Sequence, residues 1–254
     1  MSDRDGDGQE KRTPGVDEPR PPPKRFYKSA DVRQDEAGFH VMLDGRPIRT
    51  PGKRPFAVPT RALAEAIAAE WNDQAETIDP QTMPLTRLVN TGIDGVGENR
   101  DEIIGAVAAF AGSDLLCYRA DGPAGLVTRQ ADAWDPVLAW AEAELGGPWV
   151  TTTGLMPVAQ APETLARVEA ALRPFDDLSL NALHVMTALT GSALLALAHG
   201  RGRLSAEEAW TAAHVDEDWQ IEQWGEDAEA ADRRQYRRGE LNSASRLLAL
   251  INQA

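Results

Sequence analysis

SAEEAWTAAHVDEDWQIEQWG, running from Ser205 to Gly225, is the stretch from which the second half of this chain can be understood. Ser205 and Glu208, three residues apart, form a capping box, which predicts that a helix begins here. Gly225 predicts where the helix ends, because glycine tolerates the left-handed conformation that often follows a last helical turn.

A single helix over this stretch, at about 100° per residue, gathers its large side chains on one face. They are Trp210, Ala213, His214, Ile221 and Trp224. Glu217 falls in the middle of that face, where an unpaired carboxylate is costly to bury. Two interpretations follow: Glu217 lies in the core and pairs with an arginine or with His214, or it sits at a rim and meets a ligand or partner.

Composition sets limits on the kind of protein and on its partners. The chain has 254 residues, enough for one large or two smaller domains, and 26 basic against 40 acidic side chains give a net charge of −14. This charge disfavours nucleic acid and anionic membranes as partners. A single cysteine, Cys117, excludes an internal disulfide and indicates either a reducing compartment or a protein indifferent to redox conditions.

The first 23 residues contain no apolar run and end in three prolines. We expect residues 1–23 to form a disordered acidic tail. They show no secretory signal, and their acidity argues against a mitochondrial presequence.

Residues 24–122 predict an α+β unit. Short β-prone runs lie between residues 24 and 58, and Asp44-Gly45 separates two of them, which indicates an antiparallel meander of three or four strands. Helical periodicity follows over residues 60–74, with Thr60 as the expected cap, and over residues 83–96 and 98–114. Residues 115–120 are a strand candidate that would rejoin the meander.

Residues 123–254 predict an all-α domain, so the expected fold class is α+β with a helical C-terminal half. Helices are expected over residues 132–145 and 162–172. Residues 178–200 carry no Asp, Glu, Lys or Arg, but their polar residues and missing aromatic belt favour a buried central helix over a membrane span. A charged, exposed helix over 226–240 and a docked segment over 241–251 complete the chain.

Familiar catalytic motifs are missing. The sequence has no phosphate-binding loop, dinucleotide fingerprint or nucleophile elbow, and its four histidines and Cys117 lack metal-ligand spacing. We therefore predict no catalytic residue, cofactor or metal site, and we expect His184 to be a core histidine. A small-molecule hydrolase using Glu217 and Asp216, and a structural acidic interaction protein, stay open as alternatives.

Seven ordered blocks give the sequence a resemblance to a known family. They are KRFYK from Lys24, LDGRPIRTP (43–51), VPTRALAEAIAAEW (58–71), MPLTRL (83–88), SDLLCYR (113–119), DPVLAW (135–140) and DEDWQIEQWG (216–225). In these blocks the chain resembles the ATP-twelve family of assembly chaperones for the catalytic head of F-type ATP synthases.

The resemblance implies an ATP-independent chaperone rather than an enzyme. Such proteins bind the free alpha subunit of the synthase head and shield its nucleotide-site interface. From the net charge and the polar residues of segment 178–200, we expect no nucleic-acid partner and no membrane insertion. The resemblance also implies an α+β domain followed by a helical domain, and a bacterial, cytoplasmic version is expected from the tail. The resemblance places the essential acid at Glu217. The predicted partner-binding residues are Glu217, Asp216, Trp210, Trp224 and Glu222.

Overall fold

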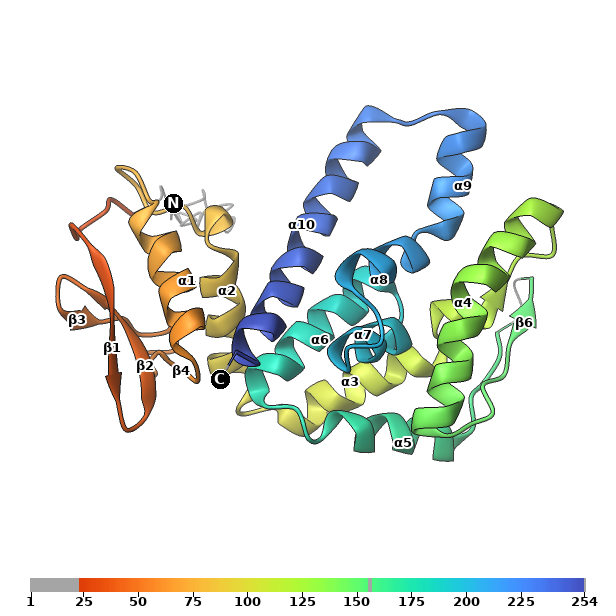
Figure 1. Ribbon diagram of the computed structural model, residues 1–254, viewed down its shortest axis with the longest axis horizontal. Helices are drawn as coiled ribbons and strands as arrows, with labels where there is room; N and C mark the ends of the chain where they lie inside the picture. The colour runs from red at the N-terminus through yellow and green to blue at the C-terminus, as the bar shows by residue number, and fades with distance from the viewer. Residues whose placement is uncertain (1–22, 155–156, 254) are drawn as a thin grey trace, which may run out of the picture.

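The computed structural model describes residues 23–154 and 157–253. A four-stranded β-sheet lies at one end of the molecule, and the rest is mainly helical, with one short pair of strands (Figure 1). This arrangement confirms the predicted α+β class, with an antiparallel meander followed by a helical part. The predicted disordered tail lies outside the described residues, apart from Pro23.

The sheet is built around its second strand. Strand β1 (Ala30–Asp35) pairs antiparallel with β2 (Gly38–Leu43), and β2 pairs on its other edge with both β3 (Arg46–Pro47) and β4 (Ala57–Val58). The β2–β3 turn falls at Asp44-Gly45, where both residues have positive φ, as the sequence predicts. The buried face of β2 supplies Val41 and Leu43 to the core.

Helix α1 (Arg61–Asn72) packs on β1 and β2 and begins where predicted. The Thr60 Oγ1 accepts a hydrogen bond from the Leu63 N–H at 3.2 Å, which satisfies one of the free donors of the first turn. The same hydroxyl donates to the Leu250 carbonyl at 2.8 Å. The start of α1 is therefore tied to the C-terminal end of the chain.

A buried carboxylate joins α1 to the next helix. Glu70 belongs to α1 and is only 8% exposed. Its carboxylate reaches the start of α2 (Pro84–Thr91), which follows the 3-10 turn η1 (Pro80–Thr82). Its Oε1 accepts the Leu85 N–H at 2.7 Å, and its Oε2 accepts the Thr86 N–H at 2.8 Å and hydroxyl at 2.7 Å. Glu70 thus caps a helix that has no cap in its own sequence, in the place where the helix dipole favours negative charge.

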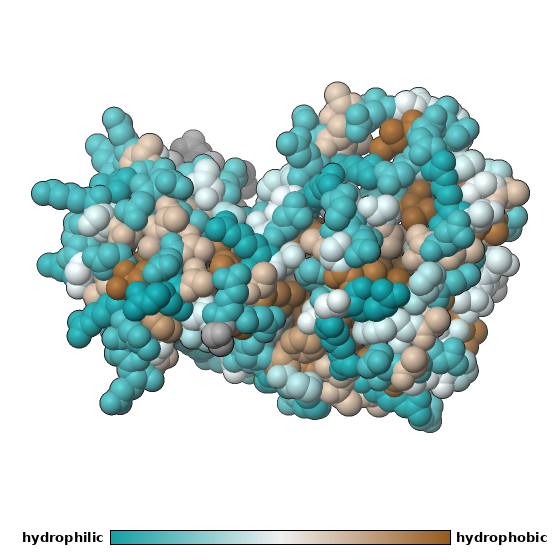
Figure 2. Space-filling view, in the orientation of Figure 1, coloured by the Kyte–Doolittle hydropathy of each residue, from teal (hydrophilic) through white to brown (hydrophobic). Residues whose placement is uncertain are grey.

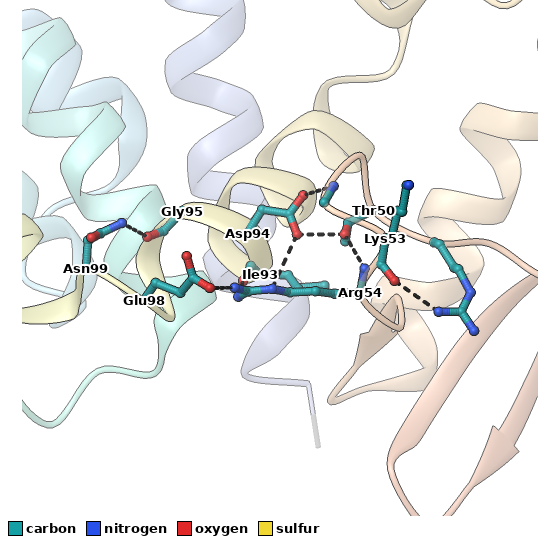
Figure 3. A network of polar contacts seen from close by, with 10 residues as sticks. Thr50, Lys53, Arg54, Ile93, Asp94, Gly95, Glu98 and Asn99 are labelled. Carbon is teal, nitrogen blue, oxygen red and sulfur yellow. Dashed lines mark hydrogen bonds and ion pairs between the residues drawn. The ribbon is translucent and has the colours of Figure 1, made fainter.

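The loop between β3 and β4 is fastened to a π-helical turn, η2 (Gly92–Val96). Asp94 accepts the Thr50 hydroxyl at 2.6 Å and the Gly52 N–H at 2.7 Å, and Arg54 donates to the Ile93 carbonyl at 2.8 Å (Figure 3). The hydrogen bond from Thr50 holds the pKa of the Asp94 carboxyl below its usual range. This network couples the sheet to the helices that follow it.

The remaining elements form the helical part. They are α3 (Arg100–Gly112), η3 (Leu115–Cys117), β5 (Tyr118–Arg119), α4 (Ala124–Leu145), β6 (Thr152–Thr153), α5 (Pro162–Leu172), α6 (Asp177–Thr190), α7 (Ala193–Gly200), α8 (Ala206–Ala213), α9 (Val215–Trp224) and α10 (Ala228–Ile251). Helix α3 packs on α5 and α6, and α10 packs on α6. The buried apolar residues form one cluster from Tyr27 to Leu248, and the division of the chain near residue 122 stays a prediction.

The strand predicted over residues 115–120 does not rejoin the meander. Residues 115–117 form the 3-10 turn η3, in which Leu116 and Cys117 are fully buried. The Leu115 N–H donates to the Gly191 carbonyl at 3.2 Å, so the segment docks on the turn after α6. Only β5 is extended, and it pairs in parallel with β6, across the connection that contains α4.

The single helix predicted over residues 178–200 is two helices. Gly191 has φ 67° and ends α6, and the Ser192 hydroxyl accepts the Leu195 N–H to cap α7. Asp114 is fully buried beside this break, where it accepts the Leu194 N–H at 3.1 Å. Burial raises the pKa of Asp114 to about 6. Within the described residues, no helix is both long and apolar enough to cross a membrane.

The two C-terminal segments expected at 226–240 and 241–251 are one continuous helix, α10. Leu241, Ala244, Leu247 and Leu248 are buried, whereas the residues before them are largely exposed. Arg87 of α2 pairs with Glu240 at 2.7 Å, where the helix enters the core. Half of α10 is therefore anchored and half projects into solvent.

We expect Glu70→Gln to lower the free energy of unfolding by about 2–4 kcal/mol, because the amide replaces one acceptor oxygen and the charge that caps α2 is lost. Chemical denaturation measures this change. Glu65→Gln, on the exposed side of the same helix, is the matched control and should change stability by less than about 0.5 kcal/mol. Equal effects of the two substitutions would contradict the capping role of Glu70.

Candidate partner-binding site

The stretch from Ser205 to Gly225 begins and ends as predicted but is broken at His214. The capping box is formed, with the Glu208 N–H donating to the Ser205 hydroxyl at 3.1 Å and the Ser205 N–H donating to the Glu208 carboxylate at 2.7 Å. Gly225 ends α9 with φ 87°. Between these ends, α8 stops at Ala213 and α9 starts at Val215.

Two side chains explain the break. The ring Nδ1 of His214 lies 2.8 Å from the Trp210 carbonyl. In a continuous helix the backbone N–H of His214 would donate to this carbonyl. It donates to the Thr211 carbonyl instead. The indole Nε1–H of Trp134 donates to the Ala212 carbonyl at 2.7 Å, in the buried interior. These side-chain contacts compete with the α-helical hydrogen bonds to the same two carbonyls, and the helix is broken where they act.

The prediction that Trp210 and Trp224 share one face is wrong. Trp210 is 3% exposed and stacks on the His214 ring, with 3.7 Å between the ring centroids. Trp224 is 78% exposed at the end of α9. The turn at His214 separates the two tryptophans, so that one fills the core and the other lies on the surface.

Helix α9 is held against α4. Gln130 of α4 donates to Asp216 at 2.6 Å, and the guanidinium of Arg129 binds both oxygens of Glu222, at 2.7 and 2.6 Å. The Arg129 guanidinium also lies over the Trp219 ring, 4.9 Å from its centroid. The hydrogen bond from Arg129 lowers the pKa of Glu222 from its ordinary value. Two of the predicted contact residues, Asp216 and Glu222, are thus engaged inside the chain.

An opening separates α9 from the projecting half of α10. The helices diverge from α8 and are joined at their far ends by residues 225–227, which gives the pair the form of an arch (Figure 1). An ion pair between Asp218 and Arg234 crosses the opening. Apolar atoms are visible inside it, surrounded by hydrophilic surface (Figure 2).

Two adjoining cavities make up this opening. One, of about 280 Å³, lies between α9 and α10 and is lined in part by Glu217, Trp224 and Ala230. The other, of about 560 Å³, extends toward α4 and is lined in part by Val215. Both cavities share Ile221, Glu226 and Arg234, so they are two sides of one apolar space with an acidic rim.

Glu217 lies at the rim of this opening. Its side chain is 36% exposed, and its Oε2 is 3.8 Å from the Nε2 of His214. Within the described residues, Glu217 forms no ion pair with a lysine or arginine. Burial lowers the pKa of His214, and the Glu217 charge partly offsets this effect. Glu217 therefore lies next to the core but is turned toward solvent.

The α9 side of the arch is strongly acidic, whereas the α10 side carries Arg233, Arg234, Arg237 and Arg238. Residues 215–230 contain seven acidic and no basic side chains. Adjacent positions on a helix do not face each other, so Glu217 and Asp216 diverge, and Asp216 is directed to Gln130. Within residues 23–154 and 157–253, no three His, Cys, Asp or Glu side chains are grouped to hold a metal ion. The arrangement suits recognition of a basic, partly apolar protein surface.

Sequence reasoning missed the residues that hold α9 in place. Arg129 and Gln130 are 93 and 86 residues away from their partners on α9, and nothing in their local sequence marks them. Arg234 belongs to a recognisably charged segment, but its pairing with Asp218 depends on the geometry of the arch. Such long-range pairs leave no periodic signal in a single sequence.

Comparison with known proteins places the chain in a family. The sequence pattern described as "ATP12 chaperone protein" matches residues 24–142. Protein atp12, mitochondrial, of Schizosaccharomyces pombe is 25% identical over 228 residues, which cover 84% of this chain and 78% of that protein. Two solved structures superpose with a TM-score of 0.86 over 91% of this chain. Atp12 from Paracoccus denitrificans is 42% identical with 99% of it covered, and a protein of Agrobacterium tumefaciens is 46% identical with 87% covered. This chain belongs to the ATP12 family of chaperones.

Proposed function

We propose that this protein is an ATP-independent chaperone that binds the free alpha subunit of F-type ATP synthase while the catalytic head is assembled. Its membership of the ATP12 chaperone family supports a role in the assembly of ATP synthase. The observation that carries the proposal is the side of α9 that lines the opening, where Trp224 is 78% exposed although it is a large aromatic side chain.

Glu217 and Trp224 form the proposed contact surface. They are seven residues apart on α9 and therefore lie on the same side of the helix, two turns from each other. Binding energy at protein interfaces is concentrated in a few aromatic and charged residues that become desolvated. Trp224 supplies apolar area, and Glu217, which pairs with no Lys or Arg of the described residues, supplies a carboxylate for a basic side chain of the client.

The other three predicted residues act by positioning α9. Trp210 fills the core and stacks on His214 at the break. Asp216 and Glu222 fasten α9 to α4 through Gln130 and Arg129. We therefore assign the direct contact to Glu217 and Trp224, and the orientation of α9 to Trp210, Asp216 and Glu222.

The alternatives predict different behaviour. A hydrolase using Glu217 and Asp216 needs both carboxylates at one substrate, whereas the two diverge on α9 and Asp216 bonds Gln130. A structural acidic protein would show no preference for the alpha subunit. A bacterial, cytoplasmic location is part of the proposal, and the similar solved structures come from the bacteria Paracoccus and Agrobacterium.

Co-purification tests the proposal. The protein is expressed with the cognate alpha subunit or beta subunit alone, and we expect it to retain alpha but not beta. Trp224→Ala and Glu217→Gln should each lower the amount of alpha retained by about tenfold or more, since each removes a central contact. Tyr236→Ala, at a 61% exposed aromatic on α10, and Glu65→Gln, on α1, are the matched controls.

Two outcomes would reject this assignment. If the protein retained the beta subunit as readily as the alpha subunit, the alpha subunit would not be its specific client. If the Trp224→Ala and Glu217→Gln variants both retained the alpha subunit fully, the alpha subunit would still be the client, but α9 would not be its binding surface. Thermal unfolding of each variant separates loss of binding from loss of fold.

The position of Glu217 near His214 also predicts how the His214 ring titrates. Nuclear magnetic resonance of the His214 ring should give a pKa below the ordinary value of about 6.5. In Glu217→Gln this pKa should fall further, because the nearby negative charge that favours protonation is removed. An unchanged titration would show that Glu217 points away from His214.

The same histidine affects stability in a defined direction. Its folded pKa is lower than its unfolded pKa, so the unfolded chain binds more protons as the pH falls through about 6.5. Protonation of His214 therefore lowers the free energy of unfolding as the pH falls below about 6.5, and this effect is absent at higher pH.

A further inference from the structure

The segment that forms the sheet has the opposite charge to the rest of the chain. Residues 24–59 contain eight basic and four acidic side chains, whereas the whole chain contains 26 basic and 40 acidic ones. This basic segment forms the sheet, which lies at the other end of the molecule from α9 (Figure 1). A local basic surface on a chain of net charge −14 attracts partners that the rest of the chain repels.

A groove with an aromatic wall lies within this basic part. It has a volume of about 630 Å³, within the range of about 300–1,000 Å³ typical of ligand clefts. Phe26 packs edge-on against Tyr27, with ring centroids 5.4 Å apart, and Tyr27 packs edge-on against Trp71 at 5.6 Å. Leu43 and Ile48 complete the apolar lining. Phe26 is nevertheless 73% exposed.

Two arginines stand beside this apolar lining. Arg46 forms no side-chain hydrogen bond or ion pair with any residue that the structure describes, and Arg49 bonds only the Lys53 carbonyl, at 3.0 Å, within the same set. The one acid of the groove, Asp44, accepts the backbone N–H groups of Lys28 and Ser29 at 3.0–3.1 Å. The guanidinium groups of Arg46 and Arg49 thus face solvent with no carboxylate assigned to them.

We infer that this basic aromatic groove, defined by Phe26, Tyr27, Leu43, Arg46, Ile48, Arg49 and Trp71, binds an extended acidic segment of a partner protein. One large apolar side chain of the segment packs against the Phe26–Tyr27–Trp71 wall, and flanking carboxylates pair with Arg46 and Arg49. Charge complementarity selects the segment, because a basic one would meet two unpaired guanidinium groups. This inference does not depend on the α9 site.

The chemistry favours protein over nucleic acid as the occupant. The backbone of a nucleic acid carries a negative charge at every nucleotide, but this acidic chain has only a short basic region to bind it. The apolar lining, with one aromatic wall, suits a single side chain flanked by a few carboxylates.

The test measures binding to the full chain by fluorescence anisotropy. The probe is a labelled pentapeptide with phenylalanine at its centre and two glutamates on each side. We expect it to bind, and we expect Arg46→Glu combined with Arg49→Glu, or Phe26→Ser alone, to weaken binding by about tenfold or more. Arg33→Glu, an exposed position on β1 that does not line the groove, should stay within twofold of the unsubstituted protein.

Probe controls sharpen the result. A serine-centred peptide should bind about tenfold more weakly, and a lysine-flanked peptide should not bind. The Trp224→Ala and Glu217→Gln variants should bind the acidic peptide normally, which keeps this inference distinct from the client site on α9. Melting temperatures of the groove variants should match that of the unsubstituted protein, because Phe26, Arg46 and Arg49 are exposed.

Four outcomes would overturn the inference. The double arginine variant could bind the acidic peptide as well as the unsubstituted protein does. A labelled oligothymidylate could bind more tightly than the peptide, which would assign the groove to nucleic acid. Replacement of Asp17 and Glu18 by Asn and Gln could strengthen peptide binding tenfold, which would make the chain's own N-terminal segment the occupant. The unsubstituted protein could self-associate, and both the Arg46→Glu and the Trp224→Ala variants could lose this self-association. The occupant of the groove would then be a second copy of the chain.

Discussion

The burial of one half of α10 is the constraint on which the candidate site depends. Its C-terminal half packs on α6, α2 and α1, and Leu241 and Leu247 are completely buried there. Thr60 bonds the Leu250 carbonyl, and Arg87 pairs with Glu240, so this half is fixed to the sheet and to the helices together. The other half must then project. Because α9 is fastened to α4 instead, the two helices diverge and leave an acidic, partly apolar opening between them (Figure 1).

Features that depend on neighbouring residues could be predicted from the sequence. The meander with its Asp44-Gly45 turn, the Thr60 cap, the Ser205–Glu208 capping box and the end of α9 at Gly225 are all present. The break at His214 could not be predicted, because the pattern of residues 205–225 is compatible with one helix. It is the indole of Trp134, from another helix, that takes the carbonyl of Ala212.

The same limit applies to the candidate site. The sequence singled out Glu217 and Trp224 as unusual, and both lie on the side of α9 that lines the opening. It also singled out Trp210, whose indole is buried, because a single helix would have put it beside Trp224. The basic aromatic groove was not anticipated at all. Phe26 and Trp71 are 45 positions apart, and they meet in one groove because residues 24–27 pack against the end of α1, where the Tyr27 hydroxyl donates to the Trp71 carbonyl at 2.6 Å.

Hydrogen–deuterium exchange of the co-purified complex with the alpha subunit tests most directly whether the client binds to the side of α9 that lines the opening. We expect residues 217–227 to become protected in the complex, because a client bound to α9 would suppress the local opening of this helix end. The buried half of α10, residues 241–251, should exchange equally slowly with and without the client. Unchanged exchange of residues 217–227 in a complex that is demonstrably intact would show that the client does not bind to α9.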